Sequence, residues 1–138
     1  MGYNCIFIVI YNTDKKNYVD KLVDVQIPQF IQYYLDFPNH YTLCDYLIQV
    51  YNKNGGKKKS SNINMVITRE ILLQLIKNIT YNRGIFKTDY LDTVNDDGID
   101  TFDVYSGTEN KTKILLQLYK LLDEINKDEI IVYTGSSN

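Results

Sequence analysis

The two ends of the chain are its most continuously apolar stretches. Residues 3–11 form an almost unbroken run of Ile, Val, Phe and Tyr, which is typical of a central strand covered on both faces. Residues 129–134 read as a second strand of this kind. We expect these two strands to lie side by side in the centre of a sheet. The residues that follow, 135–138, are Gly, Ser, Ser and Asn and predict a frayed tail.

Apolar residues at helical spacing predict two short helices after the first strand. The second begins near Pro28, which suits a first helical turn, and ends at Pro38. The residues that carry the spacing are Tyr18, Leu22 and Val25 in the first helix, and Ile31, Tyr34 and Leu35 in the second.

Three longer helices are predicted further along, each preceded by a residue that can cap it. Those residues are Thr42, Thr68 and Ser106. The second of these helices is expected to close at Gly84, and the third covers 108–126. The apolar faces are Leu43, Tyr46, Leu47, Val50 and Tyr51; Ile71, Leu72, Leu75, Ile76 and Ile79; and Ile114, Leu115, Leu118, Leu121, Leu122 and Ile125.

Alternating or extended patterns fill the intervals between these helices. Residues 63–67 predict a short strand, and 85–92 with 99–105 predict a hairpin turning at Asp97-Gly98. The order is β, three helices, β, α, hairpin, α, β. It predicts a single α/β domain of the α+β type over 1–138, with a mixed sheet of four or five strands and helices packed against it.

The amino-acid composition narrows the class of protein and the compartment that are compatible with this predicted fold. The 138 residues are 44% hydrophobic, enough for a core, and the apolar run at the start is too short to cross a bilayer. We therefore expect a cytoplasmic protein without membrane contact. Thirteen of the 15 cationic residues are Lys, and Asn, Ile and Tyr are abundant, which indicates an AT-rich gene such as those of viruses, phages or low-GC bacteria. The cysteines Cys5 and Cys44 are expected to be reduced and buried.

Acidic residues concentrate in the predicted hairpin. Residues 88–138 hold 4 cationic and 11 acidic residues, whereas 1–87 hold 11 and 6. Three interpretations stay open: a metal-dependent hydrolase or nuclease site, an acidic surface for a basic partner, and a solvated strand edge. An EF-hand loop is excluded, since Thr93 and Val104 stand where acidic ligands are needed. The metal site would use Asp92, Asp96, Asp97 or Asp100, and the partner surface Asp96, Asp97, Asp100 and Asp103.

The stretch 53–61 is polar, glycine-containing and basic, and predicts a flexible loop. It lacks the Walker A pattern, because Tyr51 stands where the first glycine is required. Its lysines Lys57, Lys58 and Lys59 are candidates for binding an anion or a nucleic-acid backbone.

Two further features complete the candidates. The single histidine, His40, lies four residues before Cys44, and a Cys–His dyad is the catalytic alternative to a surface turn. Tyrosines are frequent between 33 and 51, and Tyr33 and Tyr34 are candidates for a protein interface. We assign no catalytic residue, metal ligand or cofactor. The first hypothesis is a small non-enzymatic interaction or inhibitor domain that docks onto a protein partner; the alternatives are the metal-dependent enzyme and nucleic-acid binding through the lysine loop.

Overall fold

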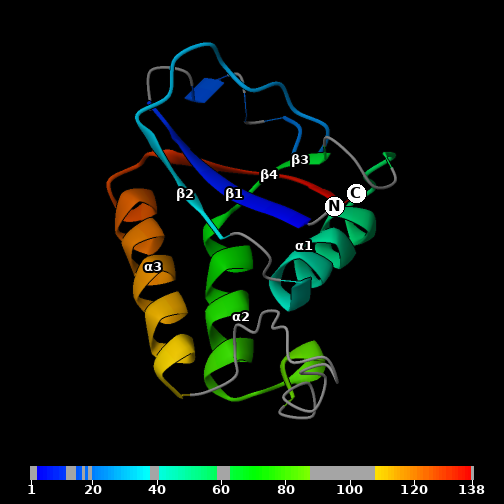
Figure 1. Cartoon of the computed structure of the whole chain (residues 1–138). Helices are drawn as coiled ribbons and strands as arrows, with labels where there is room; N and C mark the ends of the chain where they lie inside the picture. Colours follow the sequence, from blue (N-terminus) through cyan, green and yellow to red (C-terminus); the bar gives the residue numbers. More distant parts are fainter. Residues whose placement is uncertain are drawn as a thin grey trace.

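A computed structural model describes residues 3–11, 15–16, 18, 20–37, 41–58, 63–87 and 108–137, without the side chains of 3–4, 41, 108–110 and 136–137. Within these residues the chain forms four strands, three α-helices and a 3₁₀ turn (Figure 1). In chain order the elements are β1 (Tyr3–Ile10), β2 (Tyr33–Asp36), α1 (Tyr41–Lys53), β3 (Ile63–Val66), α2 (Arg69–Thr80), η2 (Gly84–Phe86), α3 (Thr108–Asn126) and β4 (Ile130–Ser137).

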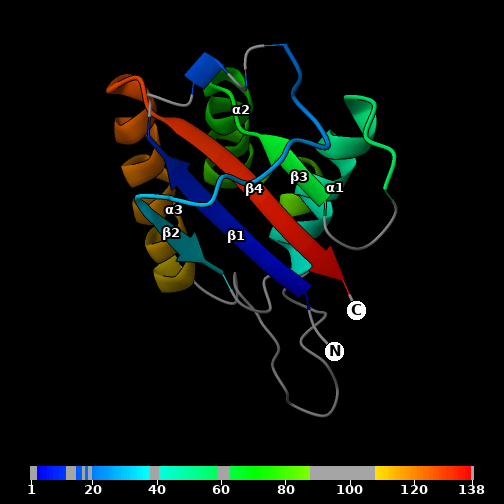
Figure 2. The same ribbon diagram turned by 90° about the horizontal axis from the view of Figure 1, so that it is seen from above.

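The strands form one sheet in the order β2-β1-β4-β3, seen from above in Figure 2. The expected α+β class with about four strands is confirmed, and so is the central pairing of the two terminal strands. The three pairings are all antiparallel instead of a mixture of parallel and antiparallel.

The central strands are continuously apolar because both faces of the sheet are covered. Phe7 and Tyr133 pair across β1 and β4 and face the helices, with their ring centroids 5.8 Å apart. Their neighbours Ile8 and Val132 pair on the opposite face and belong to a second apolar cluster. Alternate residues of a strand point to opposite faces, so one run of apolar residues supplies both clusters.

The last strand is longer than the sequence pattern predicts. β4 continues to Ser137, where Ser137 pairs with Tyr3. Gly135 is buried and pairs with Cys5 on one side and Ile63 on the other. The prediction of a frayed tail is wrong for 135–137, because pairing with the neighbouring strands fixes the backbone of these polar residues.

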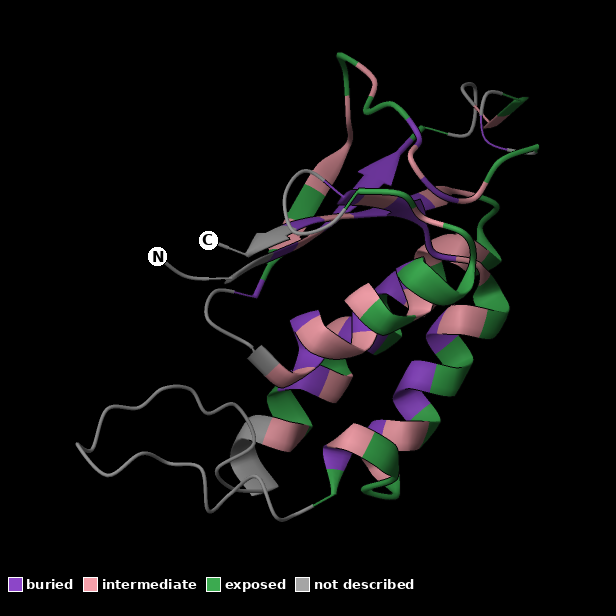
Figure 3. Cartoon of the chain, turned by 90° about the vertical axis from the view of Figure 1, so that its right-hand side faces the viewer, coloured by how far each residue is buried: buried purple, intermediate pink, exposed green. Residues whose placement is uncertain are grey.

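The helices cover one face of the sheet and an irregular segment covers the other. Buried residues gather between the sheet and α1, α2 and α3 (Figure 3). On the opposite face, residues 20–32 cross over the sheet at the top of Figure 1. The outer cluster contains Tyr18, Val25, Val66, Val132, Ile8 and Ile10, with Leu22 and Ile31 packed against it.

The two short helices predicted before Pro38 are wrong. The described residues between 18 and 32 contain no α-helix, and Val23 instead forms a bridge with Met65 of β3. Residues 33–36 are strand β2, paired with β1. The side chains at 33, 35 and 37 pack on the helix side, whereas those at 34 and 36 are exposed, and this two-residue alternation overrides the weaker helical spacing of Ile31, Tyr34 and Leu35.

The three longer helices are confirmed, but Thr42 does not precede the first of them, because α1 already begins at Tyr41. Thr68 caps α2 by accepting a hydrogen bond from the backbone N–H of Ile71 at 3.2 Å. Each helix is followed by a residue in the left-handed region: Gly55 (φ 89°), Asn82 (φ 52°) and Asp128 (φ 71°). Asn82, not Gly84, occupies this position after α2, because the N–H of Arg83 returns to the carbonyl of Asn78 at 2.8 Å in a Schellman motif.

The predicted hairpin is tested only at its beginning. Ile85 and Phe86 belong to η2 and not to a strand, so the predicted start at 85 is wrong. The remainder, including its Asp97-Gly98 turn and the capping residue Ser106, lies outside the described residues. Among the helices that the structure describes, none has the length and apolar character needed to cross a membrane.

Candidate functional site

The two edges of the sheet differ in what covers them. At β3, the segment 22–24 lies along the outer edge: Asp24 donates its N–H to the carbonyl of Asn64 at 2.8 Å, and Val66 donates to the carbonyl of Leu22 at 2.7 Å. At the other edge, β2 pairs with β1, and no second strand among the described residues pairs with it. We call this outer side of β2 (Tyr33–Asp36) the open edge.

The register of β2 shows which backbone groups reach the open edge. Phe37 donates its N–H to the carbonyl of Cys5 at 2.9 Å, so this position faces β1. In an antiparallel ladder the direction of the N–H and C=O groups alternates from residue to residue. The backbone groups of Leu35 therefore also face β1, whereas those of Tyr34 and Asp36 point outward. An extended segment placed beside β2 would find donors and acceptors at these two positions.

The side chains around the open edge offer apolar area to solvent. Tyr34 is 57% exposed and pairs with Ile8, so its ring lies on the outer face of the sheet. Phe30, shortly before β2, is 72% exposed, more than any other large hydrophobic residue among those described. An aromatic side chain held this far out of the core contributes little to folding, because it buries little area.

Tyr33 does not belong to this exposed surface. Its side chain points to the helix side and its hydroxyl donates a hydrogen bond to Glu124 Oε2 of α3 at 2.5 Å. Partial burial, together with this carboxylate, raises the pKa of Tyr33 to about 12. Of the two tyrosines predicted as interface residues, Tyr34 is presented to solvent and Tyr33 fastens β2 to α3.

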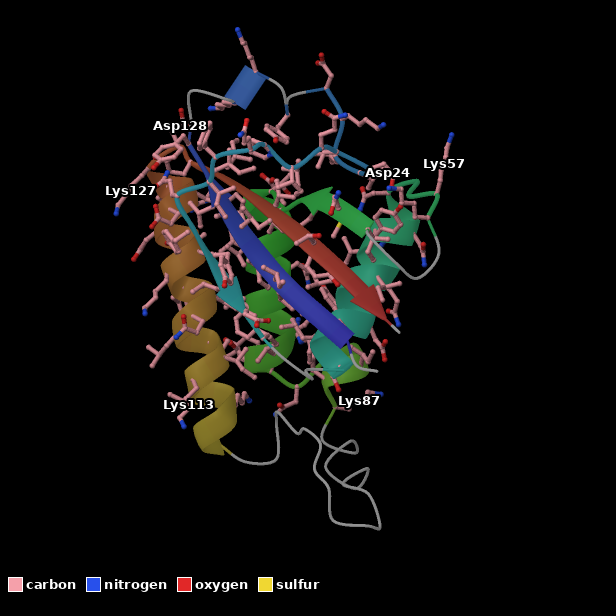
Figure 4. All side chains as sticks on the ribbon, turned by 45° about the horizontal axis from the view of Figure 1, so that its top comes forward. Asp24, Lys57, Lys87, Lys113, Lys127 and Asp128 are labelled. Atoms are coloured by element: carbon pink, nitrogen blue, oxygen red, sulfur yellow. The ribbon has the colours of Figure 1, made fainter. Side chains whose placement is uncertain are left out.

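The basic loop is fastened at its start. Asp24 has a left-handed backbone (φ 57°) that turns its carboxylate toward the end of α1. There it accepts hydrogen bonds from the hydroxyl of Tyr51 and from the N–H of Lys57 at 3.2 Å, and the hydroxyl of Tyr51 accepts one from the N–H of Lys58 at 2.8 Å. Figure 4 shows Asp24 and Lys57 close together at this corner. The hydrogen bond from Tyr51 holds the pKa of the Asp24 carboxyl below its ordinary value.

The predicted loop at 53–61 is therefore only partly loop. Lys53 is the last residue of α1, and the backbone of 56–58 is hydrogen-bonded to Tyr51 and Asp24. The side chains of Lys57 and Lys58 are exposed, as an anion-binding role requires. Lys59 lies outside the described residues. In the described part of this stretch, the backbone N–H groups of Gly56, Lys57 and Lys58 all have hydrogen-bond partners.

The two cysteines meet in the core. Cys5 on β1 and Cys44 on α1 are both free and buried, and the hydroxyl of Tyr133 is buried beside them. Burial and the neighbouring Cys44 raise the pKa of the Cys5 thiol well above its ordinary value. Because a thiolate is the reactive form of cysteine, this thiol is held in its unreactive form. His40, the other half of the predicted dyad, lies outside the described residues.

The acidic candidates also lie outside the described residues. They are Asp92, Asp96, Asp97, Asp100 and Asp103, predicted for metal or partner binding. Within the described part of the chain, no three residues of the metal-binding types gather in one place. The acidic hairpin consequently stays a prediction from sequence.

The open edge is a feature that sequence reasoning missed, although a signal for it exists. Ile31, Tyr33, Leu35 and Phe37 alternate with more polar or exposed positions, which is the pattern of a half-buried strand.

No protein-family model, curated protein or solved structure matches the chain.

Proposed function

We propose that this chain is a protein-binding domain that receives an extended segment of a partner along the open edge of β2. The observation that supports the proposal is the outward direction of the backbone groups of Tyr34 and Asp36, next to the exposed rings of Tyr34 and Phe30. In recognition by strand addition, main-chain hydrogen bonds supply affinity and adjoining side-chain surfaces supply selectivity.

The surroundings of the edge favour this role over simple exposure. Natural edge strands are protected by charges, prolines, bulges or covering segments. β2 carries one outward charge, at Asp36, and an exposed tyrosine in its interior. Tyrosine is enriched in interfaces because its ring provides contact area and its hydroxyl provides a hydrogen bond. The opposite edge, at β3, is already paired with 22–24, so the two edges are treated differently within one sheet.

A proline at position 34 provides the sharpest test. The N–H of Tyr34 points away from β1, so Tyr34→Pro removes an outward donor and places a ring on the edge without breaking a bond to β1. Peptides of about ten residues, long enough to cover the strand, are selected from a random display library against the wild-type chain. Their affinity is then measured by fluorescence anisotropy for each variant.

We expect Tyr34→Pro to weaken the selected peptides by about tenfold or more, since one main-chain hydrogen bond contributes about 0.5–1.5 kcal/mol and the ring adds steric exclusion. Tyr34→Thr keeps the N–H and should retain part of the affinity. Tyr81→Ser is the control, because Tyr81 is 61% exposed and directly follows α2, whose last turn lies away from the sheet (Figure 1). Selected peptides that bind Tyr34→Pro as tightly as the wild type would show that the edge is not the binding surface.

A further inference from the structure

Three lysines, two on α3 and one directly after it, follow one another at intervals of seven residues: Lys113, Lys120 and Lys127. Seven residues are close to two helical turns, so the three lie in one row, with successive members about 10.5 Å apart and the ends about 21 Å apart. All three are exposed. Figure 4 shows Lys113 near the start of α3 and Lys127 just past its end, both on the outer side of the helix. We call these three residues the lysine row.

The lysine row borders the side of α3 that faces β2. Glu124 is four residues after Lys120 and three before Lys127, so it lies next to both on the helix surface. Glu124 accepts the hydrogen bond of Tyr33 at 2.5 Å, which fixes this side of α3 beneath β2. In Figure 2, which views the sheet from above, β2 lies across α3. A strand added outside β2 would consequently run above the lysine row.

The described part of the chain gives none of the three lysines an ion-pair partner, although carboxylates lie nearby. The one ion pair among the described residues joins Lys15 and Asp128, and none of the three lysines takes part in it. Two carboxylates lie close by on α3: Asp123, which is exposed, and Glu124, which is hydrogen-bonded to Tyr33. Asp36 of β2 projects to the outer face, away from the helices. The three lysines outnumber the two carboxylates on α3, so the helix side beneath the open edge has a net positive charge.

The length of the row matches an extended segment. A strand rises about 3.3 Å per residue, so a span of about 21 Å corresponds to six or seven residues. Every second side chain of such a strand would face the helix side, giving three or four positions within reach of the row. Lysine side chains are long and flexible, so they can meet charges whose spacing differs from their own.

From this arrangement we propose that the segment received at the open edge is an acidic strand, with carboxylates on its helix-facing side contacting Lys113, Lys120 and Lys127. This inference rests on the proposed function and specifies its partner chemistry. Electrostatic complementarity of this kind selects among partners and accelerates association. It also selects the register, because a shift by one residue turns the carboxylates away from the lysines.

Three synthetic peptides test the inference. Each alternates Thr with one other residue over about seven positions, the length that the row spans; that residue is Asp in the first peptide, Asn in the second and Lys in the third. Binding is followed by chemical-shift changes of the backbone amides of the ¹⁵N-labelled full chain. We expect the Asp peptide to bind at least about tenfold more tightly than the Asn peptide, to weaken with added salt and to shift the amides of 34 and 36. The Lys peptide should not bind there.

Charge reversal supplies the matched comparison. The triple variant Lys113→Glu, Lys120→Glu, Lys127→Glu should prefer the Lys peptide over the Asp peptide. A second triple variant, Lys53→Glu, Lys57→Glu, Lys58→Glu, changes the net charge equally at the distant end of α1 and should keep the wild-type order. A third variant replaces Lys113, Lys120 and Lys127 by Gln, which removes the positive charges without introducing negative ones. It should bind the Asp and Asn peptides equally. This comparison remains informative if charge reversal disturbs the folding of α3.

The possible failures are distinguishable. If the Asp and Asn peptides bind equally well at positions 34 and 36, the acidic-strand inference is wrong and the proposed function stands. If both triple reversals weaken the Asp peptide to the same extent, only net charge matters and the row has no specific role. If no peptide, including those from the display library, shifts the amides of 34 and 36, the proposed function itself fails together with the inference.

Discussion

Replacing Gly56 by alanine should destabilise the fold more than the same change at Gly55, and for a different reason. Gly55 ends α1 with a left-handed backbone, and a Cβ there would lie in open space. A Cβ on Gly56 would overlap the ring of Tyr51, which is fully buried. The two neighbouring glycines thus separate a conformational requirement from a steric one.

The expected magnitudes follow from these surroundings. An alanine in the left-handed region costs about 1–2 kcal/mol, which sets the effect at Gly55. Overfilling a packed site costs about 1–3 kcal/mol. At Gly56 the Tyr51 ring cannot retreat freely, because its hydroxyl is bonded to Asp24 and Lys58, and losing one of these bonds adds about 1 kcal/mol. We expect a loss of about 2–4 kcal/mol for Gly56→Ala.

Urea unfolding followed by circular dichroism measures both variants against the wild type. The midpoints should fall in the order wild type, Gly55→Ala, Gly56→Ala, with unchanged slopes. Gly55→Asn is the control, because asparagine tolerates the left-handed region and should recover part of the loss. A midpoint for Gly56→Ala at or above that of Gly55→Ala would refute the reasoning, since it would mean that the Tyr51 ring is not held against the glycine.

Three further predictions follow from the described contacts. Tyr33→Phe should lower the free energy of unfolding by about 1 kcal/mol at neutral pH, because the hydrogen bond to Glu124 is lost. The pKa of Tyr33 is raised from 10.0 to about 12 in the folded chain, so its stabilisation is complete below pH 10 and is lost as the pH rises toward 12; Tyr33→Phe should flatten that decline in urea titrations. Asn82→Ala should cost about 1 kcal/mol and Asn82→Gly little or nothing, because position 82 is left-handed; equal thermal midpoints would contradict this. Cys5 and Cys44 should react with a thiol reagent only as fast as the chain unfolds, and rapid labelling of the native protein would show that they are not buried.

Much of the framework could be predicted from the sequence. Apolar residues recur at helical spacing over α1, α2 and α3, and the terminal strands are continuously apolar because both their faces are covered. Such patterns are reliable where they are long and where one face or both faces are buried. Thr68 was predictable as a cap for a different reason: the hydrogen bond that it accepts from Ile71 joins residues three positions apart, so the local sequence suffices to form it.

The candidate site could not be predicted in the same way. The segment 31–37 satisfies both a helical and an alternating pattern, and pairing with β1 decides between them. The order of the strands decides that β2 and β3 are the two edges of the sheet. The bridge from Val23 to Met65 covers the edge at β3 and leaves β2 as the open one. The lysine spacing on α3 is visible in the sequence, but its meaning depends on the contact of Glu124 with Tyr33, which joins residues 91 positions apart.

Residue-resolved hydrogen exchange of the free chain tests the open edge of β2 most directly. The amides of Leu35 and Phe37 face β1 and should be protected, whereas those of Tyr34 and Asp36 should exchange at nearly the rate of an unstructured peptide. This alternation within one short strand is the expected result. Protection at all four positions would show that another part of the chain already occupies the edge, and would contradict the account.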